Sequence, residues 1–341
     1  MQPSFHPRLI NGPFDDPGLF VPFQFEKRGM MFDLGDISRL PAKDILKIGQ
    51  VFITHTHMDH MVGFDRLLRL LLGRDKSLHL YGPEGFLKNV EGKLAGYTWN
   101  LVKHYDARFS IAASEIGPTH LSTQVYPCHS GFIPDTTMVK TPRCPVVFKE
   151  PGLTVSAAIL DHSIPSIGYC IEERFHINIR KAGLAPLGLE VGPWIQSFKE
   201  ALFNGQDPES VFEVPCSKGN ETMKRFGLGE LSTQIALITP GQKVTYLADA
   251  IYSRQNEEEM VALAMGSDHL FIEAAFLDRD STLAEKKYHL TAGQAGTIAG
   301  KAGVKRFTLF HFSPRYQDEE HRFRQEAMAA YNRYRPSGVQ D

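Results

Sequence analysis

Short apolar runs, most of them ending at a polar or turn residue, recur along both halves of the chain. They combine β-branched and aromatic residues over lengths typical of strands rather than helices. The pattern predicts strands at Leu19–Phe25, Met30–Asp33, Val51–Thr54, Leu78–Tyr81, Leu153–Leu160, Val244–Ala248, Leu270–Glu273 and Arg306–Phe310. Polar residues collect where these strands end, so candidate chemistry is expected there.

Helical periodicity appears between the strands and at the end of the chain. Helices are predicted at Arg66–Leu72, at Gln255–Met265 after the N-cap candidate Ser253, and at Gly293–Ala302. A last helix places one apolar face at Phe323, Ala327, Ala330, Tyr331 and Tyr334. Strands followed by strands mixed with helices indicate an α/β layered sandwich.

The length of 341 residues fits one large domain or two ordinary ones. Two segments, at about 96–150 and 172–234, have weak periodicity or many Gly and Pro residues. Neither shows a clear core of its own. We therefore expect a single domain over residues 1–341, with these two segments as insertions.

The composition excludes several classes of protein. A hydrophobic fraction of 42% and a charged fraction of 22% exclude disorder as the main state. The formal net charge of −2 leaves no overall basic footprint for nucleic acid, although a local basic patch stays possible. No apolar stretch approaches a membrane span, and we see no signal peptide. The four cysteines form no Cys-x-x-Cys pair, so a reduced, cytoplasmic protein is expected.

The sharpest chemical signal is the segment His55-Thr56-His57-Met58-Asp59-His60, directly after a predicted strand. Neutral imidazoles and carboxylates are ligands that Zn²⁺ and similar metals accept. The alternative is a chance cluster on a polar loop. Three histidines this close would repel one another if charged, and a bound metal removes that conflict. The pattern therefore favours a metal site.

A His-x-His-x-Asp-His segment after an apolar strand resembles the signature of the metallo-β-lactamase superfamily. The resemblance implies an α/β fold, the four-layer αββα sandwich, with a two-metal site along one edge. It also implies further ligands at strand ends, which this sequence offers in order as His162, Asp249 and His311. Asp33 resembles the family's early aspartate, which supports the metal loop without binding metal.

Further motifs resemble the ribonuclease Z branch of that superfamily. They are His162–Tyr169, His289-Leu290-Thr291-Ala292, Ala302–Arg306 and His311-Phe312-Ser313-Pro314-Arg315-Tyr316. The stretch Gly183–Gly205, with Trp194, Phe198 and Lys199, resembles an insertion that forms an RNA-gripping arm. The chain differs from the branch in having Met58 where Gly is usual, and Pro and Asp in Asn11–Gly18 instead of Gly, Thr and Ser.

The resemblance implies a distribution of the ligands. His55, His57 and His162 would hold one metal, Asp59, His60 and His311 the second, and Asp249 would bridge them. Two divalent ions are expected, zinc by default, with manganese or iron also possible. A metal-bound hydroxide would attack a phosphodiester.

Four residues are expected to assist that reaction. Asp59 would orient the water and accept its proton, and His289 is the candidate general acid. Ser313 and Arg315 would bind a phosphate oxygen. Two alternatives stay open: His289 caps or packs against the following helix, and Arg315 pairs with Asp318 or Glu319.

Two functions share these ligands. One is a ribonuclease Z-like endonuclease that cuts RNA near a 3′ end, including transfer RNA precursors. The other is a phosphodiesterase or ester hydrolase acting on a small molecule. A di-iron redox protein on the same scaffold is disfavoured, because such proteins tend to have Glu at the position of His57. A binding protein that has lost its metals is disfavoured because the ligand set is complete. The expected partner is RNA or a small phosphodiester, without a membrane, and a homodimer is possible.

Overall fold

The computed structural model describes residues 4–24, 26–135, 138–215 and 223–335. These residues form two compact units. The smaller unit comprises Glu172–Gln242 with Phe148–Thr154, and the larger unit comprises Phe5–Val147, Val155–Ile171 and 243–335. The segment 172–234, predicted as an insertion, lies within the smaller unit. Whether the whole chain forms one domain with insertions stays a prediction.

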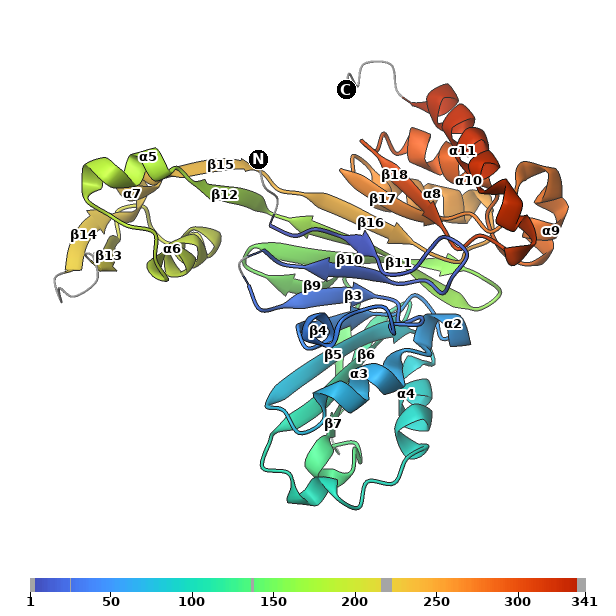
Figure 1. Ribbon diagram of the computed structural model, residues 1–341, viewed down its shortest axis with the longest axis horizontal. Helices are drawn as coiled ribbons and strands as arrows, with labels where there is room; N and C mark the ends of the chain where they lie inside the picture. The colour runs from blue at the N-terminus through green and yellow to red at the C-terminus, as the bar shows by residue number, and fades with distance from the viewer. Residues whose placement is uncertain (1–3, 25, 136–137, 216–222, 336–341) are drawn as a thin grey trace. The chain divides into compact units, whose positions relative to one another are not determined.

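An eight-stranded sheet occupies the N-terminal half of the larger unit (Figure 1). Its order is β1 (Arg8–Leu9), β2 (Leu19–Pro22), β3 (Gly29–Phe32), β4 (Ile48–Phe52), β5 (Lys76–Pro83), β6 (Phe109–Ile116), β7 (His120–Pro127) and β8 (Val139–Pro142). Strands β3 to β6 run parallel, and the outer pairs run antiparallel. The parallel strands β3 and β4 therefore end at the same edge of the sheet.

A second sheet has six strands in the order β18 (Phe307–Phe310), β17 (His269–Glu273), β16 (Lys243–Leu247), β11 (Pro165–Glu173), β10 (Leu153–Asp161) and β9 (Val146–Glu150). The neighbours β16, β17 and β18 are parallel, so their carboxyl ends also share one edge. Every strand predicted from an apolar run is present, with its ends shifted by a few residues.

The two sheets pack face to face through large aromatic side chains. Phe32 of β3 lies 5.9 Å, between ring centroids, from both Tyr169 of β11 and Tyr246 of β16. Successive residues of a strand point to opposite faces. Met31 and Val51 accordingly point away from the second sheet and join the core under the helices.

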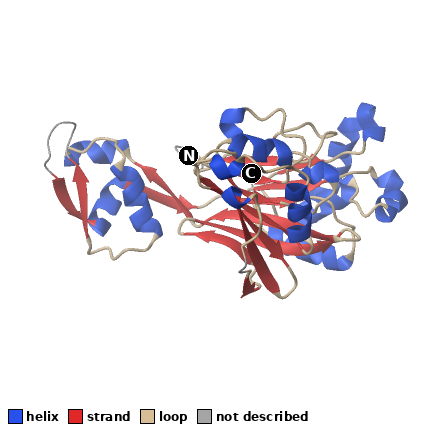
Figure 2. Ribbon diagram, turned by 90° about the horizontal axis from the view of Figure 1, so that it is seen from below, coloured by secondary structure: helices blue, strands red, loops and turns tan. Residues whose placement is uncertain are grey.

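Helices cover the outer faces of both sheets in the larger unit (Figure 2). On the first sheet they are α1 (Ala42–Ile45), α2 (Met58–Met61), α3 (Phe64–Leu71) and α4 (Phe86–Ala95), with the short turns η1 (Val102–His104) and η2 (Cys128–Ser130). On the second they are α8 (Arg254–Ala264), α9 (Ser281–Lys286), α10 (Ala292–Lys301) and α11 (Glu320–Tyr334), with η4 (Asp278–Asp280) and η5 (Pro314–Glu319). The layer order is therefore helix, sheet, sheet, helix.

Two helix predictions can be compared residue by residue. The Ser253 hydroxyl accepts the backbone N–H of Asn256 at 3.2 Å, so the predicted N-cap of α8 is confirmed. On α11, Phe323, Ala327 and Tyr331 are buried as predicted. Tyr334 is 43% exposed, because it lies in the last turn before the helix ends at Arg335.

The segment 96–150 supplies strands to the first sheet. Its β6 is largely buried but mixes small and polar residues with apolar ones, and its β7 carries a polar run at Ser122-Thr123-Gln124. Neither pattern resembles the apolar runs of the other strands, which accounts for the weak periodicity of the segment.

The smaller unit has a core of its own. A ribbon of β12 (Phe175–Ile179) and β15 (Ala236–Pro240) and a hairpin of β13 (Val211–Pro215) and β14 (Met223–Gly227) are antiparallel pairs. Its helices are α5 (Lys181–Leu184), η3 (Ala185–Leu187), α6 (Trp194–Phe203) and α7 (Leu228–Ile235). Trp194 and Phe198 are buried in this core, so both side chains pack within the unit instead of standing at its surface as contact groups.

The packing of α10 against α11 gives a stability prediction. A Cβ at Gly296 would lie 2.1 Å from the Ala327 carbonyl oxygen, so Gly296→Ala should lower the free energy of unfolding by about 1–3 kcal/mol. Gly92→Ala on α4 is the control, because nothing lies within 4 Å of its Cβ and alanine favours helices by up to about 1 kcal/mol. Urea unfolding measures both. A stabilised Gly296→Ala protein would contradict the close approach.

Among the described residues, no helix combines the length and apolarity needed to cross a bilayer.

Candidate metal centre

The predicted ligands meet at the shared edge where the strands of the two sheets end. His55 and His57 follow β4, and His57 precedes the first residue of α2, which carries Asp59 and His60. His162, Asp249 and His311 follow β10, β16 and β18. Met58 begins α2 in an ordinary helical conformation and is 80% exposed, so this position does not require glycine.

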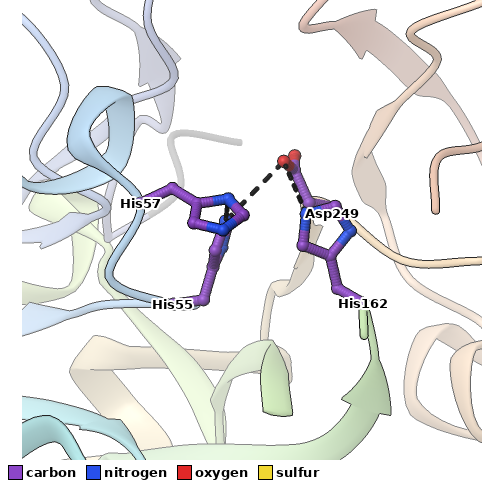
Figure 3. A group of neighbouring side chains, drawn as sticks. All are labelled: His55, His57, His162 and Asp249. Carbon is purple, nitrogen blue, oxygen red and sulfur yellow. Dashed lines mark hydrogen bonds and ion pairs between the residues drawn. The ribbon is translucent and has the colours of Figure 1, made fainter. Parts of the chain in front are cut away.

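The first group of donors comprises His55, His57, His162 and Asp249, drawn in Figure 3 with their side chains turned toward one another. One donor atom from each lies within 4.8 Å of the others. The Asp249 Oδ2 atom is 3.7 Å from His55 Nε2 and 3.6 Å from His162 Nε2. These separations are too long for hydrogen bonds but suit two ligands bound at about 2.0–2.1 Å to one ion.

The second group comprises Asp59, His60 and His311. The Asp59 Oδ2 atom is 3.2 Å from His311 Nε2 and 3.6 Å from His60 Nε2. Asp249 also reaches this group: its Oδ2 is 3.5 Å from His60 Nε2, and its Oδ1 is 2.9 Å from His311 Nδ1. The aspartate therefore lies between the two groups, and all seven predicted metal ligands come together.

Three buried atoms of this cluster make no well-aligned hydrogen bond within the described residues: His60 Nε2, Asp249 Oδ1 and His311 Nδ1, of which the last two lie 2.9 Å apart as an ion pair. Burying such an atom unpaired costs about 1–3 kcal/mol. A divalent cation among them would satisfy all three, and nitrogen with carboxylate oxygen is a donor set that such cations accept. The residues present therefore fit a metal centre.

The second ring nitrogen of three of these histidines is already occupied. His162 Nδ1 donates to the Tyr288 carbonyl oxygen at 2.7 Å, His60 Nδ1 to Asp33 at 2.9 Å, and His55 Nδ1 to the Thr54 hydroxyl at 3.1 Å. Each bond fixes the tautomer that leaves the Nε2 lone pair for a metal.

The buried groups of the cluster shift one another's pKa values: burial lowers the pKa of His60, but the Asp249 and Asp33 carboxylates outweigh it and raise that pKa to about 10. Burial lowers the pKa of His55 to about 2, so its ring is neutral and can act as a ligand. Burial raises the pKa of Asp59, but the His311 hydrogen bond and His60 outweigh it and set that pKa at about 2. The carboxylate is thus ionised throughout the physiological range.

Asp33 lies fully buried beneath the cluster. Its backbone adopts a positive φ of 56° at the end of β3, which turns the side chain toward Thr54 and His60. It accepts the Thr54 N–H at 2.7 Å, the Thr54 hydroxyl at 3.0 Å and the Tyr246 hydroxyl at 3.0 Å, in addition to His60. This arrangement supports the predicted role of holding the metal loop. Sequence reasoning did not find the contributions of Thr54 and Tyr246.

Replacing Asp33 should weaken metal binding without removing a ligand. Asp33→Asn loses the charge that holds His60, so we expect the dissociation constant for zinc to rise roughly 10–100-fold. Competition with a chromogenic chelator measures it. Asp65→Asn, whose carboxylate pairs with Lys93 on the protein surface at 3.1 Å, is the matched control. Equal affinities of a folded Asp33→Asn protein and the wild type would rule out this role.

His289 belongs to the same edge, and its partner is Glu273, which sequence reasoning missed. The His289 Nδ1 atom lies 3.1 Å from Glu273 Oε2, while the fully buried Glu273 also accepts the Ala250 N–H at 3.0 Å. Burial lowers the pKa of His289, but the Glu273 carboxylate outweighs it and raises that pKa. Glu273 ends β17, which lies between the strands that lead to Asp249 and His311. Its place as an acidic residue at the end of a predicted strand could have identified it from the sequence.

The two alternative readings of His289 and Arg315 can be checked. Thr291, not His289, caps α10, through a capping box with Gln294. Glu319 pairs with Arg279 at 2.6 Å and with Arg322 at 3.2 Å, and Arg315 makes no ion pair with any acid of the described residues. The Arg315 guanidinium instead lies 5.8 Å from the Phe276 ring centroid.

A pocket of about 510 Å³ opens onto these side chains. Its lining includes the ligands His57, Asp59, His162, Asp249 and His311, then His289, Ser313 and Arg315, and also Phe14, Asp15, Asp16, Phe276 and Lys287. The pocket is large enough for a nucleotide-sized group beside the metal centre.

Comparisons with known proteins agree with this geometry, although no model of a protein family matches the chain. The chain is 31% identical over 317 residues to a Thermobifida fusca protein named ribonuclease Z, covering 91% of this chain and 83% of the relative. The fold matches a metallo-β-lactamase fold protein from Bacillus subtilis with a TM-score of 0.52, 14% identity and coverage of 96% and 94%. It matches the short form of human tRNase Z with a TM-score of 0.52, 19% identity and coverage of 92% and 93%.

The layered sheets and the histidine-rich edge are those of the metallo-β-lactamase fold, as the sequence predicted. Within that class, the chain belongs to the ribonuclease Z family. It is accordingly a metal-dependent hydrolase that cleaves phosphodiester bonds.

Proposed function

We propose that the chain is an endoribonuclease that cuts transfer RNA precursors near their 3′ ends with two divalent metal ions, zinc by default. The relatives named ribonuclease Z and the fold shared with a tRNase Z support the substrate class. The observation that carries the proposal is the meeting of two donor groups at Asp249.

The proposed ligand sets follow the two groups. His55, His57 and His162 would hold one ion, Asp59, His60 and His311 the other, and Asp249 would contact both. When bound, two such ions supply an activated water and neutralise charge on the phosphate oxygens.

The chain's own residues have distinct tasks in this proposal. The Asp59 carboxylate, 40% exposed, orients the attacking water and accepts its proton. His289, held by Glu273 and favoured in its protonated form, donates a proton to the departing oxygen. Ser313 and Arg315 line the pocket and position a phosphate oxygen.

One observation favours RNA over a small molecule. A closed pocket built by the segment 96–150 would indicate a small substrate, but that segment contributes none of the described residues that line the pocket. The pocket is instead lined by strand-end loops at the edge of the sandwich.

The RNA-gripping arm stays a prediction. Between residues 172 and 242, nine acidic residues stand against seven basic ones, so overall charge does not make this segment a phosphate grip. Any RNA contact there would depend on particular basic side chains. A homodimer and a cytoplasmic location are likewise predictions.

A hydrolysis panel separates the two substrate classes. Metal-loaded protein is given bis-p-nitrophenyl phosphate and a 3′-extended transfer RNA precursor in parallel. We expect kcat/KM for the precursor to be roughly 10³-fold higher or more, because contacts remote from the scissile bond position it. Efficient turnover of the small diester with an uncut precursor would instead establish the small-molecule hydrolase.

A further inference from the structure

The segment Asn11–Gly18, which departs from the usual composition of its family, forms an ordered wall of the pocket. The Pro13 carbonyl oxygen accepts the Phe312 N–H at 2.7 Å, and the Pro17 carbonyl oxygen accepts the Gly35 N–H at 3.0 Å. Phe312 follows His311, and Gly35 lies two residues after Asp33. The wall is therefore tied at both ends to the chain segments that carry the metal centre.

Within this wall, Asp16 presents one unused carboxylate oxygen. Its Oδ2 accepts the Asp36 N–H at 3.1 Å, and its backbone oxygen accepts the Asn11 side-chain amide at 2.9 Å. Its Oδ1 makes no hydrogen bond to any described residue, and Asp16 lines the pocket together with Asp59. The side chain is thus held through one oxygen, and the other oxygen is left to accept a hydrogen bond from a group bound in the pocket.

The neighbouring Asp15 also lines the pocket and leaves its Oδ1 without a hydrogen bond to a described residue, but it differs from Asp16 in the balance of its charge. Its Oδ2 pairs with the Arg39 guanidinium at 2.9 Å and accepts the Gly12 N–H at 3.2 Å. Asp15 is exposed, and its charge is balanced by the arginine. The two adjacent aspartates therefore form a natural test and control pair.

Charge decides which part of a polynucleotide can lie beside Asp16. Phosphates are drawn to Lys287 and Arg315, two cations of the same pocket that make no ion pair with a described acid, and are repelled by a carboxylate. A group beside Asp16 must therefore be a neutral hydrogen-bond donor. In RNA such donors are the N–H groups of the bases and the ribose 2′-hydroxyl.

An aromatic face adjoins this acceptor. The Phe14 ring lines the pocket and packs edge-on against Phe312, with 5.4 Å between the centroids. A partly exposed ring held in this way offers a surface on which a base can stack.

We propose that Asp16 selects the nucleotide next to the scissile phosphate by accepting a hydrogen bond from its base or its ribose, while Phe14 supports the base. The inference rests on the proposed function, because it requires RNA in this pocket. It adds a specificity residue that the family motifs do not supply.

The test compares matched precursors. Two pairs are made for each nucleotide that flanks the cut. The members of the first pair differ only in whether the base carries its exocyclic amine, and those of the second only in whether the sugar is ribose or 2′-deoxyribose. For each protein the readout is the ratio of kcat/KM within a pair, so general losses of activity cancel. A hydrogen bond to a charged acceptor predicts a wild-type ratio of roughly 10–100 in one of these pairs.

The variant Asp16→Asn keeps an oxygen for the Asp36 N–H and puts an amide donor where the unused oxygen was. The ratio should fall to about one or invert, whereas Asp15→Asn should keep the wild-type ratio. The pair of precursors whose ratio changes in the variant shows whether the base or the ribose donates the hydrogen bond to Asp16. A wild-type ratio of one in every pair, or an unchanged ratio in Asp16→Asn, would overturn the inference. Failure of the wild type to cut any RNA would refute the proposed function and the inference with it.

Discussion

Asp249→Ala should lose metal from both groups and nearly all hydrolytic activity. Its carboxylate lies within 3.7 Å of a nitrogen from each of His55, His60, His162 and His311. Elemental analysis should find close to two metals per wild-type chain and well below one in the variant. Turnover should fall by roughly 10³-fold or more, because the ions supply the activated water.

The matched variant Asp249→Asn separates charge from shape. It keeps the size of the side chain but lowers the negative potential at the buried nitrogens. Its metal content should therefore lie between that of the wild type and that of Asp249→Ala. Circular dichroism checks that both variants are folded. Full occupancy and activity in folded Asp249→Ala protein would show that the ligand assignment is wrong.

His289→Ala should slow the cleavage of poor leaving groups while leaving the metal content unchanged. A general acid contributes typically 10²–10⁴-fold, so precursor cleavage should fall by about that factor. Hydrolysis that releases p-nitrophenolate should fall much less, because that group departs without a proton. Equal losses on both kinds of substrate would remove His289 from this role.

The pH dependence of precursor cleavage tests the role of His289 independently. A general acid acts in its protonated form, so precursor cleavage should decline as the pH rises through the pKa of His289. Glu273 raises that pKa against the opposing effect of burial. Glu273→Gln should therefore move the alkaline decline to lower pH, and an unmoved profile would show that Glu273 does not set it.

Much of the fold and the ligand set was predictable, because both depend on local sequence. Apolar runs mark buried strands, and strand ends collect ligands where parallel strands share an edge. The cluster from His55 to His60 was identifiable from its spacing alone. Asp249 and His311 required the family pattern, since a single polar residue after a strand is usually a loop residue.

What the sequence did not reveal depends on contacts between distant segments. Glu273 meets His289 only because β17 lies between β16 and β18, and Tyr246 reaches Asp33 only across the two packed sheets. The many Gly and Pro residues of the segment 172–234 gave no sign of a helix, yet Pro193 precedes the first residue of α6 with φ −58°, where its missing N–H costs nothing. The buried faces of Trp194 and Phe198 follow from that helix.

The most direct test of the central claim is the mapping of cuts in an end-labelled, 3′-extended transfer RNA precursor by chelated and by metal-reloaded protein. The account predicts one major cut near the 3′ end, lost on chelation, restored by added zinc or manganese, and absent in Asp249→Ala protein. Cleavage that persists without metal or in that variant, or a precursor left intact by reloaded protein, would contradict it.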